Sequence, residues 1–199
     1  MRGWVKNSEE EDEEESPEVA CLEEQRIIIL NGEINEKTSQ KFLQYLLSLA
    51  SQDPTKEITV YLSTYGGDAY DMMAMHDMIQ IIQCPINTVA IGKVMSAGVL
   101  ILAAGKKRTA TPNTIIMMHQ VSTEVGGSVK DLSIEISHVK ALQEVMYKLY
   151  SKYTGKALKT IEYDLTHDKY LTATEAVEYG LIDEIVPSPG AKTKKSKKR

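Results

Sequence analysis

Three side chains that could together perform nucleophilic chemistry are spread along the 199-residue chain: Ser96, His119 and Asp168. A serine hydroxyl is a poor nucleophile at neutral pH unless an imidazole takes its proton, and a carboxylate can orient that imidazole. The oxyanion that develops needs N–H donors, for which the Gly66-Gly67 turn is a candidate. A serine, a histidine and an aspartate occur in almost any chain of this length, so their presence alone does not predict a catalytic site. The elements that position them must also bring them together.

Ser96 lies in a nearly uncharged run, AIGKVMSAGVLILAAG, at residues 90–105. The β-branched residues before it predict a strand over 86–91 that Gly92 turns, and the apolar residues after it predict a buried helix over 96–104. The serine would therefore stand between a strand and a helix. A small residue that merely allows close packing at a helix start is the plain alternative.

Strands and helices alternate through the rest of the chain. Runs of β-branched residues predict strands, and apolar residues repeated every three or four positions predict helices. This alternation is typical of an α/β fold, which we predict. The other predicted strands cover residues 26–30 (closed by Asn31-Gly32), 57–62, 107–110, 114–118 and 181–186, with an exposed edge strand over 120–127; the other predicted helices cover 35–51, 68–83, 128–153, 158–165 and a short helix from the Thr172/Glu175 capping box to Gly180.

Four blocks of sequence carry more information than these isolated residues: YLSTYGGDAYDMMAMHDMIQ, GKVMSAGVLILAAGKKR, TPNTIIMMHQ and THDKYLTATEAVEYGLID. In this order and spacing they resemble the ClpP family of self-compartmentalising serine peptidases, over roughly residues 26–186. The resemblance implies a ClpP/crotonase-like α/β fold, a spiral of ββα units. It also implies a protruding handle, made of a strand and a long helix, at about residues 120–153.

The resemblance implies roles for individual residues. The family's nucleophile falls on Ser96, its general base on His119 and its orienting carboxylate on Asp168. The backbone N–H groups of Gly67 and Ala97 correspond to its oxyanion donors. The residues that would pair with an extended substrate are Gln120, Val121, Ser122 and Thr123.

The function that the resemblance implies is hydrolysis of unfolded polypeptides or peptides, through an acyl-enzyme, inside the chamber of a homo-oligomeric ring, a heptamer or tetradecamer. A AAA+ unfoldase would feed the chamber. That partner would consume the ATP, since this chain has no G-x-x-x-x-G-K-[ST] loop. No cofactor and no metal are expected for the peptidase step.

Several positions differ from the family's common pattern. Tyr65 stands where proline commonly precedes the two glycines, and Val121 stands where proline commonly follows the His-Gln pair, a change expected to loosen the substrate strand. Thr59 and Thr109 stand where aromatic residues commonly receive the unfoldase. These differences are typical of a divergent or phage-type member, and they make docking of an unfoldase uncertain.

The two ends of the chain carry strong and opposite charge. Residues 1–25 hold ten acidic and two basic residues, whereas residues 192–199 hold six basic ones, within a net charge of −5. Such segments predict disorder, so we expect a peptidase domain over 26–186, between a disordered acidic arm at 1–25 and a disordered basic tail at 187–199. A short lysine run is a weak signal, so no nucleic-acid partner is expected.

The composition excludes other classes. Hydrophobic residues make up 42% and charged residues 26%, as in ordinary globular proteins, and no stretch approaches the ~18 to 20 apolar residues that cross a bilayer. The N-terminal residues lack the apolar core of a secretory signal, and Cys21 and Cys84 lack C-x-x-C spacing. We therefore expect a soluble, cytoplasmic protein with free thiols and no membrane partner.

Other functions are compatible with parts of the sequence. A non-cleaving ClpP-like ring subunit would share the fold, although the complete Ser, His and Asp set argues against it. A phage capsid-maturation protease acting without an unfoldase would suit the charged ends. An acyl-CoA enzyme of the crotonase architecture shares the glycine-rich turn but needs a CoA pocket. Lys93 could replace the histidine as base, which the complete set also argues against.

Overall fold

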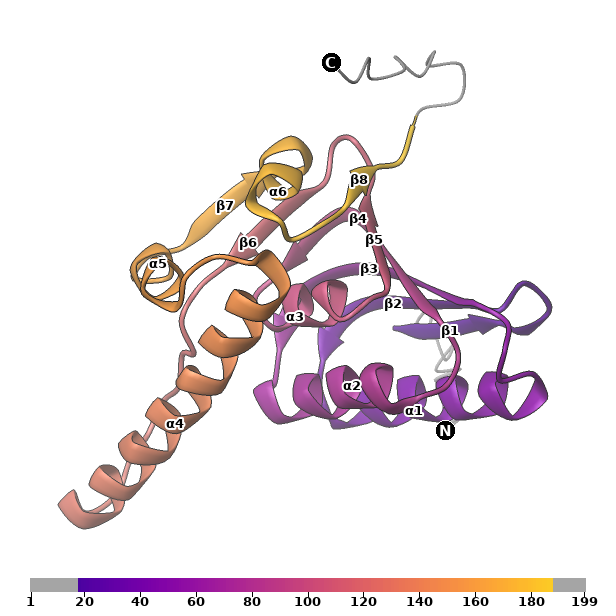
Figure 1. Ribbon diagram of the computed structural model, residues 1–199. Helices are drawn as coiled ribbons and strands as arrows, with labels where there is room; N and C mark the ends of the chain where they lie inside the picture. Colours follow the sequence, from indigo (N-terminus) through magenta and orange to yellow (C-terminus); the bar gives the residue numbers. More distant parts are fainter. Residues whose placement is uncertain (1–17, 188–199) are drawn as a thin grey trace, which may run out of the picture.

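The computed structural model describes residues 18–187, and an eight-stranded sheet forms the core of that part of the chain (Figure 1). The predicted α/β class is confirmed. The strands are β1 (Val19–Leu22), β2 (Ile27–Ile34), β3 (Ile58–Gly67), β4 (Ile86–Met95), β5 (Lys107–Ala110), β6 (Ile115–Met118), β7 (Lys169–Thr172) and β8 (Glu184–Ile185). The helices are α1 (Glu36–Gln52), α2 (Ala69–Ile81), α3 (Ala97–Ala103), α4 (Val129–Thr154), α5 (Leu158–Asp164) and α6 (Ala173–Tyr179), and Glu23–Gln25 form a 3-10 turn.

The sheet divides along β4, and this division creates the edge at which the site forms. The main order is β1-β2-β3-β4-β5-β8, with β2 to β5 parallel. The first half of β4, Asn87–Ala90, pairs with β5, whereas Lys93–Met95 pair with β6. The carboxyl ends of β4 and β6 consequently lie side by side, as ligand-binding edges of parallel sheets do.

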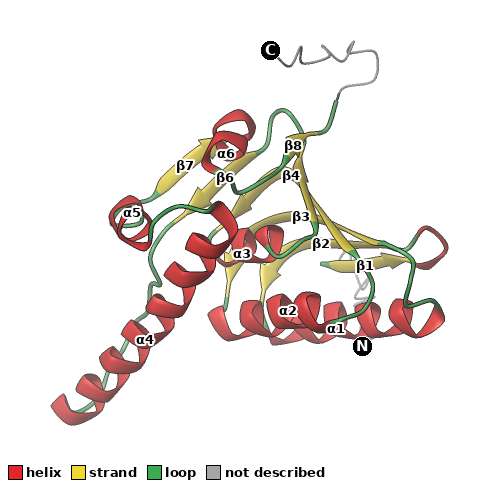
Figure 2. Cartoon of the chain, viewed as in Figure 1, coloured by secondary structure: helices red, strands yellow, loops and turns green. Residues whose placement is uncertain are grey.

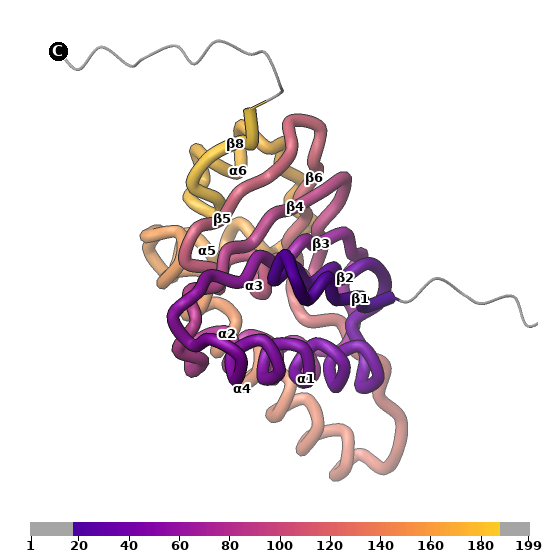
Figure 3. Tube along the Cα trace, turned by 90° about the vertical axis from the view of Figure 1, so that its right-hand side faces the viewer, coloured from indigo at the N-terminus to yellow at the C-terminus, as the bar shows by residue number. Residues whose placement is uncertain are grey.

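Helices α1 and α2 lie next to each other along one face of β1, β2 and β3 (Figures 2 and 3). Helix α1 begins where the Asn35 side chain accepts the Thr38 N–H at 3.0 Å while the Thr38 hydroxyl accepts the Asn35 N–H at 2.9 Å, a reciprocal cap. Helix α2 begins where Asp68 accepts two backbone N–H groups. Met72 and Met75 of α2 are fully buried and belong to the core.

Helix α4 projects from the body (Figure 1). Its 26 residues give it a length of about 39 Å. Only its C-terminal half is anchored, through the buried side chains of Met146, Tyr147 and Tyr150. Within residues 18–187, no helix is both long enough and apolar enough to span a membrane.

The segment before α4 corrects the handle prediction. Residues 120–127 form no strand, so the expected edge strand is wrong for the chain described here. The β-branched residues Val121, Thr123 and Val125 favour an extended chain, but a strand also needs a neighbouring strand, and no strand of the described chain pairs with this segment.

Two strands continue past the glycines that were expected to end them. Strand β2 runs through Asn31-Gly32, and β4 runs through Gly92. Gly32 has φ 138° and Gly92 has φ 66°, conformations open to glycine, so each produces an irregularity inside a strand instead of a turn. The predicted strand over 181–186 is shorter than expected, with only β8 paired to β5.

Two strands were missed altogether. Strand β1 pairs antiparallel with β2, and Val19 is buried, so residues 19–22 belong to the sheet and the predicted disordered arm over 1–25 is wrong there. Strand β7 pairs antiparallel with β6. The predicted disorder of residues 1–17 and 188–199 concerns parts of the chain that lie outside the described residues.

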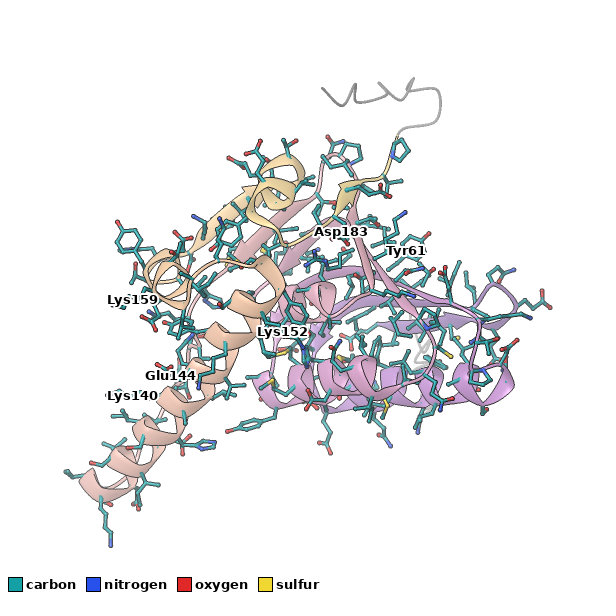
Figure 4. All side chains as sticks on the ribbon, in the orientation of Figure 1. Tyr61, Lys140, Glu144, Lys152, Lys159 and Asp183 are labelled. Carbon is teal, nitrogen blue, oxygen red and sulfur yellow. The ribbon has the colours of Figure 1, made fainter. Side chains whose placement is uncertain are left out.

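Arg108 on β5 joins three C-terminal segments to the sheet. Its guanidinium contacts Asp183 at 2.5 Å and donates to the carbonyl oxygens of Tyr153 at 3.2 Å and Gly180 at 3.1 Å (Asp183 is labelled in Figure 4). Partial burial alone would raise the pKa of the Asp183 carboxyl, but the hydrogen bonds and charge of Arg108 outweigh burial and hold that pKa below its usual value.

We expect Arg108→Lys to lower the free energy of unfolding at pH 7 by about 1 to 3 kcal/mol, because one ammonium cannot replace the forked contacts. Lys107→Gln is the matched control, since the Lys107–Glu184 pair is more than half exposed on both sides and should contribute less than the Arg108 contacts do. Because the Asp183 pKa is lowered by folding, its contribution is present above the unfolded pKa and is lost as pH falls through the folded pKa. The difference between Arg108→Lys and the parent should therefore shrink below about pH 4. Chemical denaturation measures both, and equal losses from the two variants would contradict this role.

Candidate active site

Ser96 occupies a sharp turn between β4 and α3. Its φ of 52° and ψ of −125° are unusual for a residue with a side chain and indicate local backbone strain. The Ser96 N–H donates to the Met117 carbonyl oxygen at 2.8 Å, which ties the turn to β6. A strand-to-helix turn of this kind holds a serine hydroxyl away from the sheet, as in the nucleophile turns of serine hydrolases.

Glycines allow β3 to approach this turn closely. A Cβ on Gly66 would lie 2.7 Å from the Ser96 Cβ, and one on Gly98 would lie 2.4 Å from the Thr64 Cγ2. Buried Thr64 fixes the opposite side, because its hydroxyl donates to the Gly32 carbonyl oxygen at 2.5 Å and accepts the Gly66 N–H at 2.9 Å. The position of Ser96 therefore depends on close backbone packing.

His119 follows β6 and faces the serine. Because Met95 pairs with Met117 across the parallel strands, the residues just beyond the two strand ends come together. The Ser96 Oγ and His119 Nε2 atoms are 2.7 Å apart, a hydrogen-bond distance. The His119 side chain is 26% exposed, so solvent and substrate can reach it.

Asp168 lies on the other side of the imidazole. It immediately precedes β7, whose pairing of Lys169 with Met118 brings the carboxylate next to His119. The Asp168 Oδ1 atom is 3.9 Å from His119 Nδ1, and the Asp168 side chain is 58% exposed. This separation is too long for a hydrogen bond, so the contact is electrostatic and solvent-screened.

A cavity of about 180 Å³ opens beside Ser96. It collects residues from four parts of the chain: the end of β3, the turn before α3, the segment after β6, and α4. The predicted site residues that line it are Gly67, Ser96, Ala97, His119, Gln120, Val121, Ser122 and Thr123. Of the site residues expected from sequence, only Asp168 is outside this lining, behind the imidazole.

Two backbone N–H groups predicted from sequence as oxyanion donors belong to Gly67 and Ala97. Gly67 is the last residue of β3, and the N–H of the next residue, Asp68, donates to the Ile34 carbonyl oxygen at 2.7 Å. Ala97 is the first residue of α3, and the first N–H groups of a helix have no acceptor within that helix. Both residues line the cavity.

Helix α4 supplies cavity residues that sequence reasoning missed: Glu135, Val139, Leu142 and Met146. Their spacing places them on one helical face, a signal that the sequence contained. Across the cavity, the Tyr70 hydroxyl contacts the His138 Nε2 atom, and the two rings stack with centroids 6.0 Å apart.

Lys93, the alternative base, receives no support from local geometry. The Lys93 ammonium lies 4.3 Å from the centroid of the Tyr65 ring, a cation–π contact. Within the described chain, no group of three or more His, Cys, Asp or Glu side chains is placed to hold a metal ion.

The fold and the site together define a class: an α/β protein with a serine in a strained strand-to-helix turn and a histidine within hydrogen-bonding distance, the arrangement of serine hydrolases. The family model described as Clp protease matches residues 10–189. The chain belongs to the Clp protease family and is a serine peptidase of that family. The family resemblance and the enzyme class inferred from sequence are confirmed.

Individual relatives are similar along most of their length. The chain is 37% identical to ATP-dependent Clp protease proteolytic subunit 2 of Mycolicibacterium paratuberculosis over 164 residues, 81% of this chain and 82% of the relative. It is 38% identical to ATP-dependent Clp protease proteolytic subunit 1 of Rhodococcus jostii over 168 residues, 83% of this chain and 76% of the relative. It is 35% identical to ATP-dependent Clp protease proteolytic subunit 2 of Corynebacterium jeikeium over 167 residues, 82% of this chain and 80% of the relative.

Proposed function

We propose that this serine peptidase cleaves peptide bonds with Ser96 as nucleophile, His119 as general base and Asp168 as the carboxylate that orients the imidazole. The observation that carries the proposal is the 2.7 Å contact between Ser96 Oγ and His119 Nε2 at the opening of a cavity. The strained turn at Ser96 adds support, because strain of this kind persists where it serves a function.

The reaction proceeds in two halves. His119 Nε2 takes the Ser96 hydroxyl proton as Oγ attacks the carbonyl carbon of the scissile bond, and the resulting oxyanion is stabilised by the N–H groups of Gly67 and Ala97. The imidazolium then gives its proton to the leaving amine, and the C–N bond breaks to leave an acyl-enzyme. His119 then takes a proton from water as the water oxygen attacks the ester carbonyl carbon. The bond from that carbon to Ser96 Oγ breaks, His119 returns the proton to Oγ, and the carboxylic acid product leaves.

We propose an extended, unfolded polypeptide or peptide as substrate. Residues Gln120 to Thr123 line the cavity directly after His119 and pair with no strand of the described chain. An extended substrate can pair with such backbone groups irrespective of its sequence, whereas the side-chain pocket formed by α4 selects among substrates.

We further propose that the chain acts as a homo-oligomeric ring, a heptamer or tetradecamer, that encloses the cleavage sites. The relatives are named proteolytic subunits of ATP-dependent proteases, and the sequence has no phosphate-binding loop, so a AAA+ unfoldase would consume the ATP. Val129, Ile134 and Ile136 expose apolar surface on projecting α4, which fits contact between subunits. A non-cleaving subunit, or a phage capsid-maturation protease without an unfoldase, is the competing interpretation. A cytoplasmic location stays an expectation.

Sedimentation velocity and negative-stain imaging test the chamber. We expect the purified chain to sediment as a heptamer or tetradecamer and to show rings, because a projecting apolar helix is stabilised by burial between copies. Full peptidase activity in a sample that sediments as a monomer at the assay concentration would contradict an enclosed chamber.

Replacing the nucleophile tests the chemistry. We expect Ser96→Ala to lower kcat for a fluorogenic peptide by at least about a thousandfold, because the acyl-enzyme cannot form, while the unfolding temperature stays close to that of the parent. Ser48→Ala is the matched control, since it removes an exposed hydroxyl on α1, outside the cavity lining. Parental turnover by Ser96→Ala would disprove the assignment, and binding of CoA by the parent without peptide cleavage would favour an acyl-CoA enzyme.

The loose Asp168 contact makes a second, graded prediction. A well-formed aspartate–histidine hydrogen bond is worth about 10⁴-fold in kcat, but an exposed carboxylate at 3.9 Å should contribute less. We expect Asp168→Asn to lower kcat by about 10- to 1000-fold, always less than His119→Ala does. Steady-state kinetics measure the order of the two effects, and equal or reversed losses would contradict the proposed role.

A further inference from the structure

The segment that follows His119 raises the question of what holds it in place. Residues 120–127 have no partner strand in the described chain. A side chain on α4 instead pairs with the backbone directly after Gln120. The Val121 N–H donates to the Gln143 Oε1 atom at 2.5 Å. This is a close contact between elements 22 residues apart in sequence.

Accepting the Val121 N–H leaves the NH₂ group of the Gln143 amide in an unfavourable position. Gln143 Nε2 is buried and has no hydrogen-bond partner among the described residues. Turning the amide over would place its NH₂ group against the Val121 N–H, donor against donor, so only the observed orientation pairs the backbone amide. A buried donor left unpaired is unfavourable, which indicates that the bond to Val121 decides the side-chain conformation.

Helix α4 also holds the neighbouring residue. Tyr147 lies one helical turn after Gln143 and is buried; burial raises the pKa of its hydroxyl, and the Gln120 side chain partly offsets that rise. The Val121 side chain itself packs partly buried against the core. Helix α4 thus places Gln143 against Val121 and Tyr147 near Gln120.

We propose that Gln143 is a positioning residue for the peptidase reaction: by accepting the Val121 N–H it holds Gln120 to Thr123 along the cavity beside Ser96, in the conformation that binds an extended substrate. The inference rests on the proposed function of that cavity. The inference also bears on the expectation that Val121, in place of the proline common in this family, loosens the substrate segment. Proline has no N–H, whereas valine brings a donor that needs an acceptor, and Gln143 supplies one.

The test uses Gln143→Met, which keeps the length of the side chain and removes its polar atoms. We expect kcat/KM for a fluorogenic peptide to fall about tenfold, mostly through a higher KM, because substrate positioning and not proton transfer is impaired. A small fluorophosphonate does not pair with the segment, so its rate of Ser96 labelling should stay within about twofold of the parent. Gln143→Asn, whose carbonyl is one methylene short of Val121, should act in the same direction and guards against misfolding of the first variant.

A double variant makes the inference specific. Val121→Pro removes the backbone N–H donor and Gln143→Met removes its acceptor, so the double variant leaves neither group unpaired. We expect it to recover kcat/KM to within about twofold of the parent. Glu144→Gln, on the same turn of α4, is the matched control because its side chain is exposed (Figure 4). A parental KM in both Gln143 variants, or a double variant as impaired as Gln143→Met, would overturn the inference. An inactive parent that resists labelling at Ser96 would instead overturn the proposed function.

Discussion

The approach of three backbones around Ser96 is the constraint on which the rest of this structure depends. Strand β4 must part from β5 and pair with β6, so that its last residues meet the end of β6, and Gly66 must lie against the serine. The Met117 carbonyl then holds the Ser96 amide. A side chain at Gly66 or Gly98 would push β3 away from the turn at Ser96. The Ser96 hydroxyl would then lose its contact with the His119 imidazole. The 2.7 Å distance between Ser96 Oγ and His119 Nε2 is therefore a result of sheet topology.

Helix α4 forms both the projecting apolar part of the molecule and one wall of the cavity beside Ser96. Its C-terminal half is buried against the body, while its N-terminal half projects and exposes apolar residues. Between them lies the face that lines the cavity and holds the segment after His119 through Gln143. A change in the packing of the projecting half can thus reach the cavity beside Ser96 through one helix. The exposed Asp168 contact is the weaker part of the arrangement, since solvent competes for the carboxylate.

The grouping of Ser96 with His119 was predicted from four blocks of sequence that resemble one family, and the structure brings the two side chains within 2.7 Å. Strand pattern alone could not have grouped them, although both residues stand at strand ends, and the strand ends of a parallel sheet meet at one edge. Gly92 was misread because a glycine that ends a strand and one that bends it look alike in sequence. Strands β1 and β7 were missed because four residues are too few to show a period, and pairing with β2 and β6 is what orders them. The α4 residues at the cavity followed a visible helical spacing, but which side of that helix faces the serine depends on tertiary packing.

The most direct test of the central claim is to label the active protein with a fluorophosphonate and map the adduct by peptide mass spectrometry. The account requires a single adduct on the Ser96 hydroxyl, formed much more slowly in His119→Ala, with peptidase activity lost in proportion to labelling. An adduct on another residue, or full peptidase activity after Ser96 is completely labelled, would contradict it.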